Sequence, residues 1–323
     1  MNVLITGGAG FIGSHLVDRL IQAGHEVWVL DDLSTGTMAN LDHLDANPRF
    51  HFQQGSVTDV AAVAPLVDHV DAIFHLAAAV GVKLIVSNPV RTIETNVQGT
   101  EVVLRSAAKK QKQVVLASSS EVYGKGVRIP FQEDDDLLLG PTTRSRWGYA
   151  CSKAIDEYLA LAYHREFSLP VVIARFFNTV GPRQTGRYGM VLPTFVQQGL
   201  QGQDITVYGD GEQRRCFGDV FAVVEALANL SACAAASGRV FNIGCDREIS
   251  IYALAELVRD MTGGGSRIVK IPYDEAYEDG FEDLGRRVPN LTRLDETIGF
   301  HPDTPIERII QNIIDSTRPS DGA

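Results

Sequence analysis

Cysteine is scarce in this chain, with four residues among 323, and no two of them have the two-residue spacing of a metal or redox motif. Four scattered cysteines do not form the disulfide framework of a small secreted domain, so we expect a reducing, cytoplasmic location. The N-terminus also lacks a basic segment followed by a cleavable apolar stretch, so no signal peptide is expected. Uncharged apolar runs are too short to cross a bilayer, and the sequence predicts no membrane partner.

Basic residues are the minority charge, because 29 lysines and arginines stand against 40 aspartates and glutamates, a net charge of −11. An acidic surface of this kind argues against nucleic acid or an anionic membrane as a partner. The eight histidines lack the HExxH motif and any histidine-rich spacing, so no metal site is predicted. An acidic run at residues 133–136 is interpreted as a solvated loop, because no second ligand cluster accompanies it.

Apolar residues, in contrast, are plentiful. Hydrophobic residues make up 45% of the chain and charged residues 21%, which excludes intrinsic disorder and low-complexity chains. The length corresponds to two domains of roughly 150 residues each, or to one large α/β unit with an appendage. No internal repeat is visible. The sequence therefore predicts a globular protein with a sizeable core.

A strand–helix–strand unit opens the chain. A short β-prone run at residues 3–5 is followed at once by glycines. From Ser14 onward, apolar residues fall at helical spacing until Gly24 ends the helix. Residues 26–30 then form a second predicted strand, which ends at Asp31. A unit of this length predicts two parallel strands with a right-handed crossover.

Strands and helices keep alternating as far as residue 178. Near-continuous apolar strands suit a sheet that helices cover on both faces. The fold class is therefore α/β, with an open, doubly wound parallel sheet. The further strands are predicted near residues 49–53, 72–76, 114–118 and 171–175, and the main helices at 90–110 and 149–166.

The pattern changes after Asn178, where glycines and prolines interrupt the chain and short helices and strands follow. Residues 240–243 form an apolar strand that could return to the main sheet. We therefore predict a dinucleotide-binding domain at 1–178, with a returning segment near 216–245. A smaller, interleaved α/β substrate-binding domain is predicted at 179–323.

Three glycines separate the first strand from the first helix. Gly7 permits a tight turn, Gly10 lets the backbone approach a pyrophosphate, and Gly13 lets the helix pack close to the strand. The N-terminus of the helix supplies N–H donors and the positive end of the helix dipole, and Phe11 and Ile12, which precede it, are included among the cofactor-binding residues. A glycine triplet alone also fits an ordinary turn, but between a strand and a helix it predicts a dinucleotide site.

An acidic pair, Asp31 and Asp32, lies at the end of the second strand, about twenty positions beyond the glycines. A carboxylate at Asp31 accepts hydrogen bonds from the hydroxyls of an adenosine ribose. Asp32, beside it, is included among the cofactor-binding residues. Because Asp31 would also repel a 2′-phosphate, the predicted cofactor is NAD rather than NADP. The alternative is that Asp31 is a solvated loop residue.

Tyr149 and Lys153 are four residues apart at the start of a predicted helix, so they share one face. A lysine ammonium near a phenol lowers the pKa of the tyrosine from about 10, which makes the phenolate a usable base for a sugar hydroxyl. Ser119 follows an apolar strand, at the sheet edge where ligands bind, and its hydroxyl can bond to the reacting oxygen. Taken singly, the helix spacing is common, and a serine-rich turn can also serve only backbone groups.

Together, these three elements resemble the extended short-chain dehydrogenase/reductase family, whose members modify nucleotide sugars. The resemblance covers nearly the whole chain and implies a Rossmann fold, NAD as cofactor and a nucleotide sugar, in particular a UDP-sugar, as substrate. By position it implies Ser119 as the catalytic hydroxyl, Tyr149 as the base and Lys153 as its partner. It also implies Asn96 on the cofactor side. Ser56 departs from the aspartate usual near adenine, which affects one adenine contact.

The resemblance also implies a substrate side. The residues that it places against the nucleotide sugar are Ser120, Asn178, Leu192, Tyr208, Arg215 and Arg287. Guanidinium groups suit phosphate oxygens, and a diphosphate needs two or three cations, which favours binding roles for the two arginines over solvated surface charges. Members of the family pair two helices across a two-fold axis, so we expect a homodimer through 90–110 and 149–166. Each helix could instead pack only on its own sheet.

The chemistry common to the family is oxidation at C4 of the sugar, which gives a transient 4-keto sugar. Rotation of that sugar gives an epimerase, loss of water a 4,6-dehydratase, and loss of CO₂ from C6 a decarboxylase. Glu121 is informative here, because dehydratases and decarboxylases carry glutamate where simple 4-epimerases commonly have a small or hydroxyl residue. Ser120 replaces the aspartate of much of the dehydratase class, and residues 146–153 and 286–289 are similar to the decarboxylase branch.

We therefore expect UDP-glucuronate decarboxylase chemistry, with Glu121 in the catalytic set and an arginine able to hold the C6 carboxylate. A 4-epimerase acting on UDP-glucose or UDP-glucuronate is the second hypothesis, and a 4,6-dehydratase is the third. A non-catalytic NAD-binding sensor is the hypothesis from a different class. It predicts a broken serine–tyrosine–lysine set, whereas Ser119, Tyr149 and Lys153 are all present.

Overall fold

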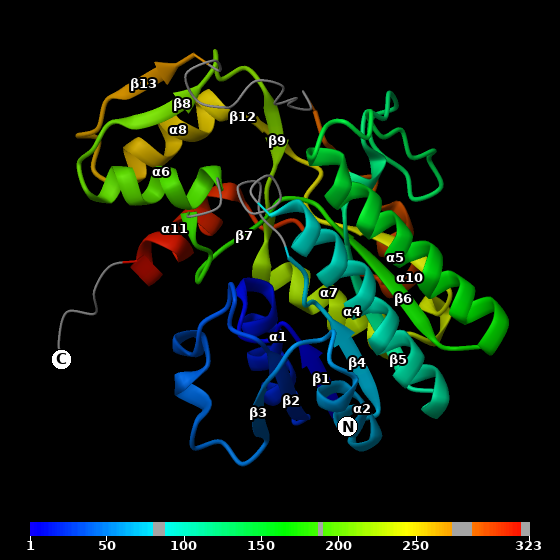
Figure 1. The fold of residues 1–323 in the computed structure, drawn as a ribbon. Helices are drawn as coiled ribbons and strands as arrows, with labels where there is room; N and C mark the ends of the chain where they lie inside the picture. Colours follow the sequence, from blue (N-terminus) through cyan, green and yellow to red (C-terminus); the bar gives the residue numbers. More distant parts are fainter. Residues whose placement is uncertain (80–87, 187–189, 273–285, 318–323) are drawn as a thin grey trace.

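A seven-stranded parallel sheet forms the centre of the molecule (Figure 1). The computed structural model describes residues 1–79, 88–186, 190–272 and 286–317. The strands lie in the order β3, β2, β1, β4, β5, β6, β11, so the chain changes direction across the sheet between β1 and β4. Ligands bind to such sheets at the carboxyl ends of the strands beside this point. The bounds are β1 (Asn2–Thr6), β2 (Glu26–Asp31), β3 (Phe50–Gln54), β4 (Ala72–His75), β5 (Gln113–Ser119), β6 (Val171–Phe176) and β11 (Arg239–Ile243).

Helices cover both faces of this sheet, which explains its near-continuous apolar strands. One face packs on α1 (Phe11–Gln22) and α7 (Val220–Ala232). The other packs on α2 (Val60–His69), α4 (Pro89–Lys110) and α5 (Arg146–Phe167). The predicted doubly wound fold is therefore confirmed. α5 begins three residues before the predicted helix, because its first turn already buries the Trp147 side chain.

α1 also begins earlier than the apolar spacing predicts. Gly10 is its N-cap, and the Ser14 N–H makes the first intrahelical bond, to Gly10 O at 3.0 Å. The side chains of Phe11 and Ile12 pack against the core on the α1 face of the sheet. The helix therefore starts directly from the glycine turn, and the N–H groups of its first turn lie at the carboxyl end of β1.

A second, smaller core lies C-terminal to β6 (Figure 1). In it, α6 (Val191–Leu200), α8 (Ile251–Met261) and α11 (Ile306–Thr317) pack around parallel strands β8 (Ile205–Tyr208) and β13 (Ile268–Ile271). Two more pairs are β7 (Thr179–Val180) with β10 (Gly218–Asp219), and β9 (Arg214–Cys216) with β12 (Glu248–Ser250). The chain returns to the main sheet as β11, as predicted for 240–243, and α10 (Thr292–Ile298) packs beside it. The division into domains at residue 178 stays a prediction.

The acidic run at 133–136 differs from the predicted solvated loop. The Glu133 carboxylate is buried, accepts the Asn242 N–H at 3.0 Å and lies 3.7 Å from Arg293 Nε. Its neighbour Asp134 is exposed. Because a buried carboxylate needs such partners, Glu133 anchors the run to β11. Within the described ranges, no cluster of side chains could hold a metal ion, and no helix is long and apolar enough to span a membrane.

Candidate active site

The glycine turn after β1 leaves room for close approach of a ligand. Gly7 has a φ of 74°, which favours glycine, and a Cβ there would lie 2.7 Å from Ala77 N. A Cβ on Gly13 would lie 2.1 Å from Gly7 O, so only glycine lets α1 pack on the turn. A Cβ on Gly10 would meet only Gly7 O, at 3.2 Å. The space beside Gly10, at the N-terminus of α1, therefore fits the pyrophosphate of a dinucleotide.

Asp31 connects the second strand to this turn. Its carboxylate is buried and accepts the N–H groups of Ala9 at 2.9 Å and Leu33 at 2.8 Å. Burial raises the pKa of Asp31, and these two hydrogen bonds only partly offset the effect. Each oxygen keeps a lone pair that can accept a ribose hydroxyl. Asp32, in contrast, is exposed, and its carboxylate accepts the Ser34 N–H at 2.9 Å.

Ser119 and Tyr149 meet at the carboxyl edge of the sheet. Ser119 ends β5 and caps the short helix η3 (Ser120–Tyr123), where its Oγ accepts the Glu121 N–H at 3.2 Å. Tyr149 is buried on the first turns of α5 and shares a hydrogen bond with Ser119. The structure thus brings together the predicted hydroxyl and the predicted base, although their catalytic roles stay predictions.

The pKa of Tyr149 differs in direction from the prediction. Burial raises this pKa above its ordinary value, and the negative charges of Glu121 and Asp156 add to the effect, while the hydrogen bond from Ser119 opposes it. The Lys153 ammonium donates a 2.8 Å hydrogen bond to Asp156, which compensates its charge. The prediction that Lys153 lowers the pKa of Tyr149 is therefore wrong for the protein chain alone.

Asn96 connects α4 to the first turns of α5. Its Oδ1 accepts the Ala79 N–H at 2.9 Å, and its Nδ2 donates to Ser152 Oγ at 3.1 Å. Ser152 Oγ in turn donates to the Tyr149 carbonyl at 2.8 Å. Asn96 is buried and fixes the backbone that carries the predicted base. Its predicted contact with the cofactor stays a prediction.

Glu121 lies between two arginines beside this tyrosine. Its Oε2 accepts from Arg146 at 3.4 Å, and its Oε1 forms an ion pair with Arg287. Burial raises the pKa of Glu121, but the two guanidinium groups outweigh burial and hold this pKa below its ordinary value. The charge of Glu121 raises the pKa of Tyr149, so the two groups lie within electrostatic range of each other. Arg146, in turn, is one helical turn before Tyr149 on α5, so the charged cluster lies on the side of the predicted base.

Three of the predicted substrate residues gather around Cys216. Asn178 Nδ2 donates to the Cys216 carbonyl at 3.1 Å, and Arg215, the preceding residue in β9, is buried. Val288, which follows Arg287, packs in one apolar cluster with Cys216. These residues therefore lie on neighbouring segments. The guanidinium of Arg287, however, pairs with Glu121, which places it on the side of the predicted base.

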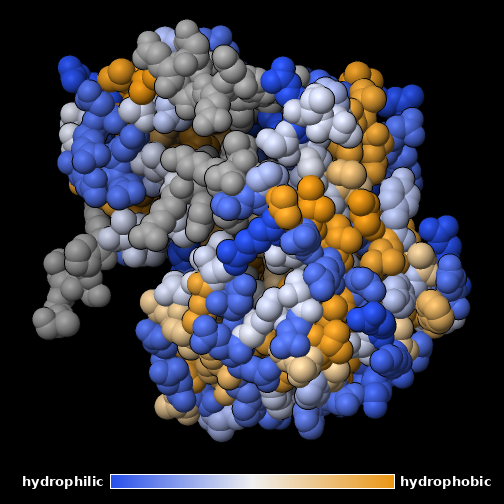
Figure 2. Space-filling model, in the orientation of Figure 1, coloured by the Kyte–Doolittle hydropathy of each residue, from blue (hydrophilic) through white to orange (hydrophobic). Residues whose placement is uncertain are grey.

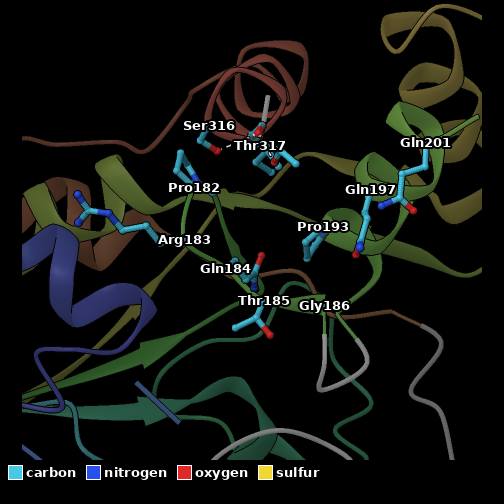
Figure 3. A pocket seen from close by; sticks show the side chains of 12 residues that line it. Pro182, Arg183, Gln184, Thr185, Gly186, Pro193, Gln197, Gln201, Ser316 and Thr317 are labelled. Carbon is cyan, nitrogen blue, oxygen red and sulfur yellow. Dashed lines mark hydrogen bonds between the residues drawn. The ribbon is translucent and has the colours of Figure 1, made fainter. Parts of the chain in front are cut away.

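The other predicted substrate residues are more dispersed. Leu192 is fully buried in the second core, whereas Tyr208 is 39% exposed at the end of β8. Ser120 is buried at the start of η3. None of the three lines the cleft between the loop after β7, α6 and the end of α11, where Gln184 and Gln197 form part of the wall (Figure 3).

Two residues outside the predicted set belong to the site. Arg146 lies three residues before Tyr149, and Asp156 lies three residues after Lys153. This spacing puts all four side chains on one side of α5. Helical periodicity was therefore the signal that could have found them, because neither residue type points to a role by itself.

Comparison with known proteins identifies the family. Residues 3–244 match the NAD dependent epimerase/dehydratase family. The chain belongs to this family. It is 42% identical to a UDP-N-acetyl-alpha-D-glucosaminuronate decarboxylase of Bacillus cytotoxicus, over 96% of each chain. It is 34% identical to UDP-glucuronic acid decarboxylase 1 of Xenopus tropicalis, over 97% of this chain and 71% of that protein.

A solved structure shows the same relationship. The UDP-glucose 4-epimerase of Thermotoga maritima, solved with UDP-glucose, matches with a TM-score of 0.87 and 30% identity over 98% of both chains. The chain is therefore an NAD-dependent enzyme that modifies nucleotide sugars, and the sensor hypothesis is wrong. The residues that would hold NAD are Gly7, Gly10, Phe11, Ile12, Gly13 and Asp31, whose turn fits the cofactor as described above.

Proposed function

We propose that this enzyme decarboxylates a UDP-linked hexuronate, with UDP-glucuronate as the first candidate substrate. One observation supports this most strongly: Glu121 lies between Arg146 and Arg287, beside Tyr149. Two guanidinium groups and one carboxylate carry one net positive charge, which suits the carboxylate of a uronic sugar. A neutral hexose offers these guanidinium groups no carboxylate to bind.

The proposed reaction divides its steps among the residues of the site. Tyr149 accepts the proton of the C4 hydroxyl, while Ser119 bonds to the same oxygen. Bound NAD⁺ supplies the hydride acceptor and a positive charge that favours the phenolate. With a ketone at C4, the C6 carboxylate is β to a carbonyl, so the C5–C6 bond breaks and CO₂ leaves. The electron pair passes into an enolate, and C5 takes up a proton that comes from water. The hydride that left C4 then returns to that carbon from the reduced cofactor, while Tyr149 gives its proton back to the C4 oxygen.

The identity of the sugar is open to two candidates. The relative at 42% identity is named for a 2-acetamido uronic sugar, and the relative at 34% for glucuronic acid. A UDP-sugar 4-epimerase is the second candidate function, favoured by the structural match to such an enzyme. A 4,6-dehydratase is the third, because Ser120 replaces the aspartate that much of that class carries.

The direct experiment follows the mass of the sugar. The purified enzyme with NAD⁺ is incubated separately with UDP-glucuronate, UDP-N-acetylglucosaminuronate and UDP-glucose, and the products are analysed by mass spectrometry. We expect loss of CO₂ from at least one uronic substrate. Retention of the carboxylate with an inverted C4 would instead identify an epimerase. Turnover of UDP-glucose alone would rule out a decarboxylase.

Two neighbouring arginines offer a matched pair of variants. Arg287→Gln removes the guanidinium that pairs with Glu121, and we expect kcat/KM for the uronic substrate to fall roughly 100-fold, since a partly buried charge pair is broken. Arg286→Gln changes the preceding residue, which is exposed and pairs with Glu248. We expect that control to stay within about threefold of wild type. Equal activities of the two variants would contradict the role given to Arg287.

We also propose a homodimer formed by α4 and α5. Apolar side chains remain exposed on the outer faces of these helices, among them Val90 and Ile93 on α4, and Ile155 and Tyr158 on α5. In Figure 2, apolar side chains gather over this part of the surface. An exposed apolar patch across two adjacent helices is typical of a protein–protein interface.

A further inference from the structure

Lys153 and Asp156 form a buried ion pair on α5. Lys153 Nζ lies 2.8 Å from Asp156 Oδ2, and their side chains are 3% and 0% exposed. Their spacing puts both on the side of the helix that carries Tyr149. Burial of two charges is costly even when they are paired, so a carboxylate at this depth calls for a functional explanation.

A series of polar side chains leads from this pair to the cofactor turn. The Thr100 hydroxyl of α4 faces Asp156 and lowers the pKa of its carboxyl, and Thr100 Oγ1 lies 3.2 Å from His75 Nε2. His75 Nδ1 lies 2.7 Å from Thr6 Oγ1, at the end of β1. Thr6, the residue before Gly7, thus connects the glycine turn to the ammonium group of the predicted catalytic lysine.

The hydrogen bonds of His75 fit one tautomer. A neutral His75 accepts at Nδ1 from the Thr6 hydroxyl and donates its Nε2–H to Thr100 Oγ1. His75 stays neutral because burial, with a further effect of Lys153, lowers its pKa to about 3. The Thr100 hydroxyl keeps its own proton for the side of Asp156, whose ionised carboxylate can only accept.

We propose that Asp156 is a positioning residue, which holds the Lys153 ammonium in place and balances its charge so that Tyr149 keeps its proton until cofactor and substrate are bound. This inference rests on the proposed roles of Tyr149 and Lys153. It agrees with the direction of the pKa of Tyr149, which burial raises first and to which Glu121 and Asp156 add. Without Asp156, the uncompensated ammonium of Lys153 would favour the phenolate more strongly.

Few of the charged groups around Tyr149 oppose ionisation of its phenol, so the effect of Asp156 on that ionisation can be measured on its own. Apart from Lys153 and Asp156, the titratable groups that face this region are Glu121 of η3 with its partners Arg146 and Arg287, His75 of β4, Arg175 of β6 and Glu157 of α5. Glu157 and Arg175 form a pair at 2.7 Å, and His75 is neutral. α4 contributes the uncharged Asn96 and Thr100. Glu121 and Asp156 therefore remain as the charges that oppose ionisation of Tyr149.

Asp156→Asn tests the proposal, because it keeps the shape of the side chain and removes the charge. We expect kcat for the uronic substrate to fall roughly 10- to 100-fold, with KM changed less than about threefold, and the acid limb of the pH–rate profile to move to lower pH. Glu166→Gln, at the exposed end of α5, is the matched control and should behave as wild type. An Asp156→Asn profile that overlays the wild-type profile would overturn the proposal.

A second measurement does not depend on turnover. The absorbance of tyrosinate is measured against pH in the NAD⁺-saturated enzyme, and the signal of Tyr149→Phe is subtracted. We expect the remaining absorbance to appear at lower pH in Asp156→Asn than in wild type. If it does so in an enzyme that turns over no uronic substrate, the proposed function fails and the positioning role of Asp156 is supported. If the wild type decarboxylates but the absorbance does not shift, the positioning role alone is overturned.

Thr100→Val covers the case in which Asp156→Asn does not fold, since the buried lysine is then left unpaired. This variant keeps both charges and removes only the hydroxyl that lies between Asp156 and His75. We expect kcat to fall by about 3- to 30-fold with the acid limb unmoved, because the carboxylate loses a polar neighbour but keeps its charge. Unchanged kcat in Thr100→Val would contradict the network.

Discussion

At the scale of single residues, the buried His75 is a source of pH-dependent stability. Burial, and then Lys153, lower its pKa from 6.5 to about 3 in the folded protein. The unfolded chain therefore takes up a proton below about pH 6.5 that the folded chain refuses, so this stability is present above that pH and is lost as the pH falls towards 3. The loss can reach about 1.4 kcal/mol per pH unit.

His75→Gln should remove this dependence. Its free energy of unfolding in urea will be lower than that of wild type at pH 7, because the bonds to Thr6 and Thr100 are disturbed. Between pH 6.5 and 4, however, we expect it to decline less steeply than that of wild type. His69→Gln, at an exposed position, is the control and should keep the wild-type slope. Parallel slopes for wild type and His75→Gln would show that another group causes the acid sensitivity.

The sequence predicts single site residues where a sequence motif defines them. It does not predict properties that depend on how deeply the fold buries a side chain. Ser119 and Tyr149 follow from their places after a strand and on a helix, and the structure brings them together. The raised pKa of Tyr149 depends on burial and on Asp156, which spacing alone does not record. Glu133 shows the same limit, because it is buried within an acidic run whose next residue is exposed.

At the scale of elements, the glycines between β1 and α1 have different roles. Gly13 is needed for the packing of α1, whereas Gly10 is needed for binding of the cofactor. We expect Gly13→Ala to lower the free energy of unfolding by about 1–3 kcal/mol, because its methyl group would meet Gly7 O at 2.1 Å. Gly10→Ala meets only Gly7 O, at 3.2 Å, and should cost less than about 1 kcal/mol. Its methyl group enters the space for the pyrophosphate, so the Kd for NAD should rise more than about tenfold.

Urea unfolding and calorimetric titration with NAD⁺ measure the two effects separately. Gly265→Ala is the control, since a Cβ there meets no atom within 4 Å, and both quantities should match wild type. A Gly10→Ala protein that binds NAD⁺ normally would show that the cofactor lies elsewhere. A Gly13→Ala protein with the same free energy of unfolding as wild type would contradict the packing described for α1.

The elements themselves follow closely from the sequence, and their ends less so. The predicted helix at 90–110 differs from α4 by one residue, whereas α1 and α5 both begin three residues earlier than predicted. At α1 the cause is backbone geometry, because the helix starts from the Gly10 cap rather than at the first periodic apolar residue. At α5 the cause is tertiary burial of Trp147.

At the scale of the whole molecule, the alternation of strands and helices was sufficient to predict the doubly wound sheet and the return of β11. Contacts between distant segments were not predictable in the same way. Glu121 and Arg287 are 166 residues apart in the chain, yet their ion pair is the observation on which the proposed reaction depends. Parallel sheets with crossover connections create such contacts, and no local pattern encodes which partners will meet.

The proposed dimer is also a property of the whole molecule, and it bears on the site. On α5, Ile155 and Tyr158 are exposed on the outer face, while Tyr149 and Lys153 are buried on the inner face. A partner that covers the outer face would therefore stabilise the helix that carries the predicted catalytic pair. Dimerisation and activity should then be coupled, because the same helix takes part in both.

Tyr158→Asp tests this coupling by placing a charge on the outer face. We expect light scattering coupled to size-exclusion chromatography to give the mass of two chains for wild type and of one chain for the variant. Turnover per chain should be lower in the monomeric variant but not in Val127→Asp, a control at an 88% exposed position outside α4 and α5. A wild-type protein with the mass of a single chain would contradict the dimer. A monomeric Tyr158→Asp with full turnover would instead show that α5 holds Tyr149 without help from a partner, through the Asn96 and Ser119 contacts alone.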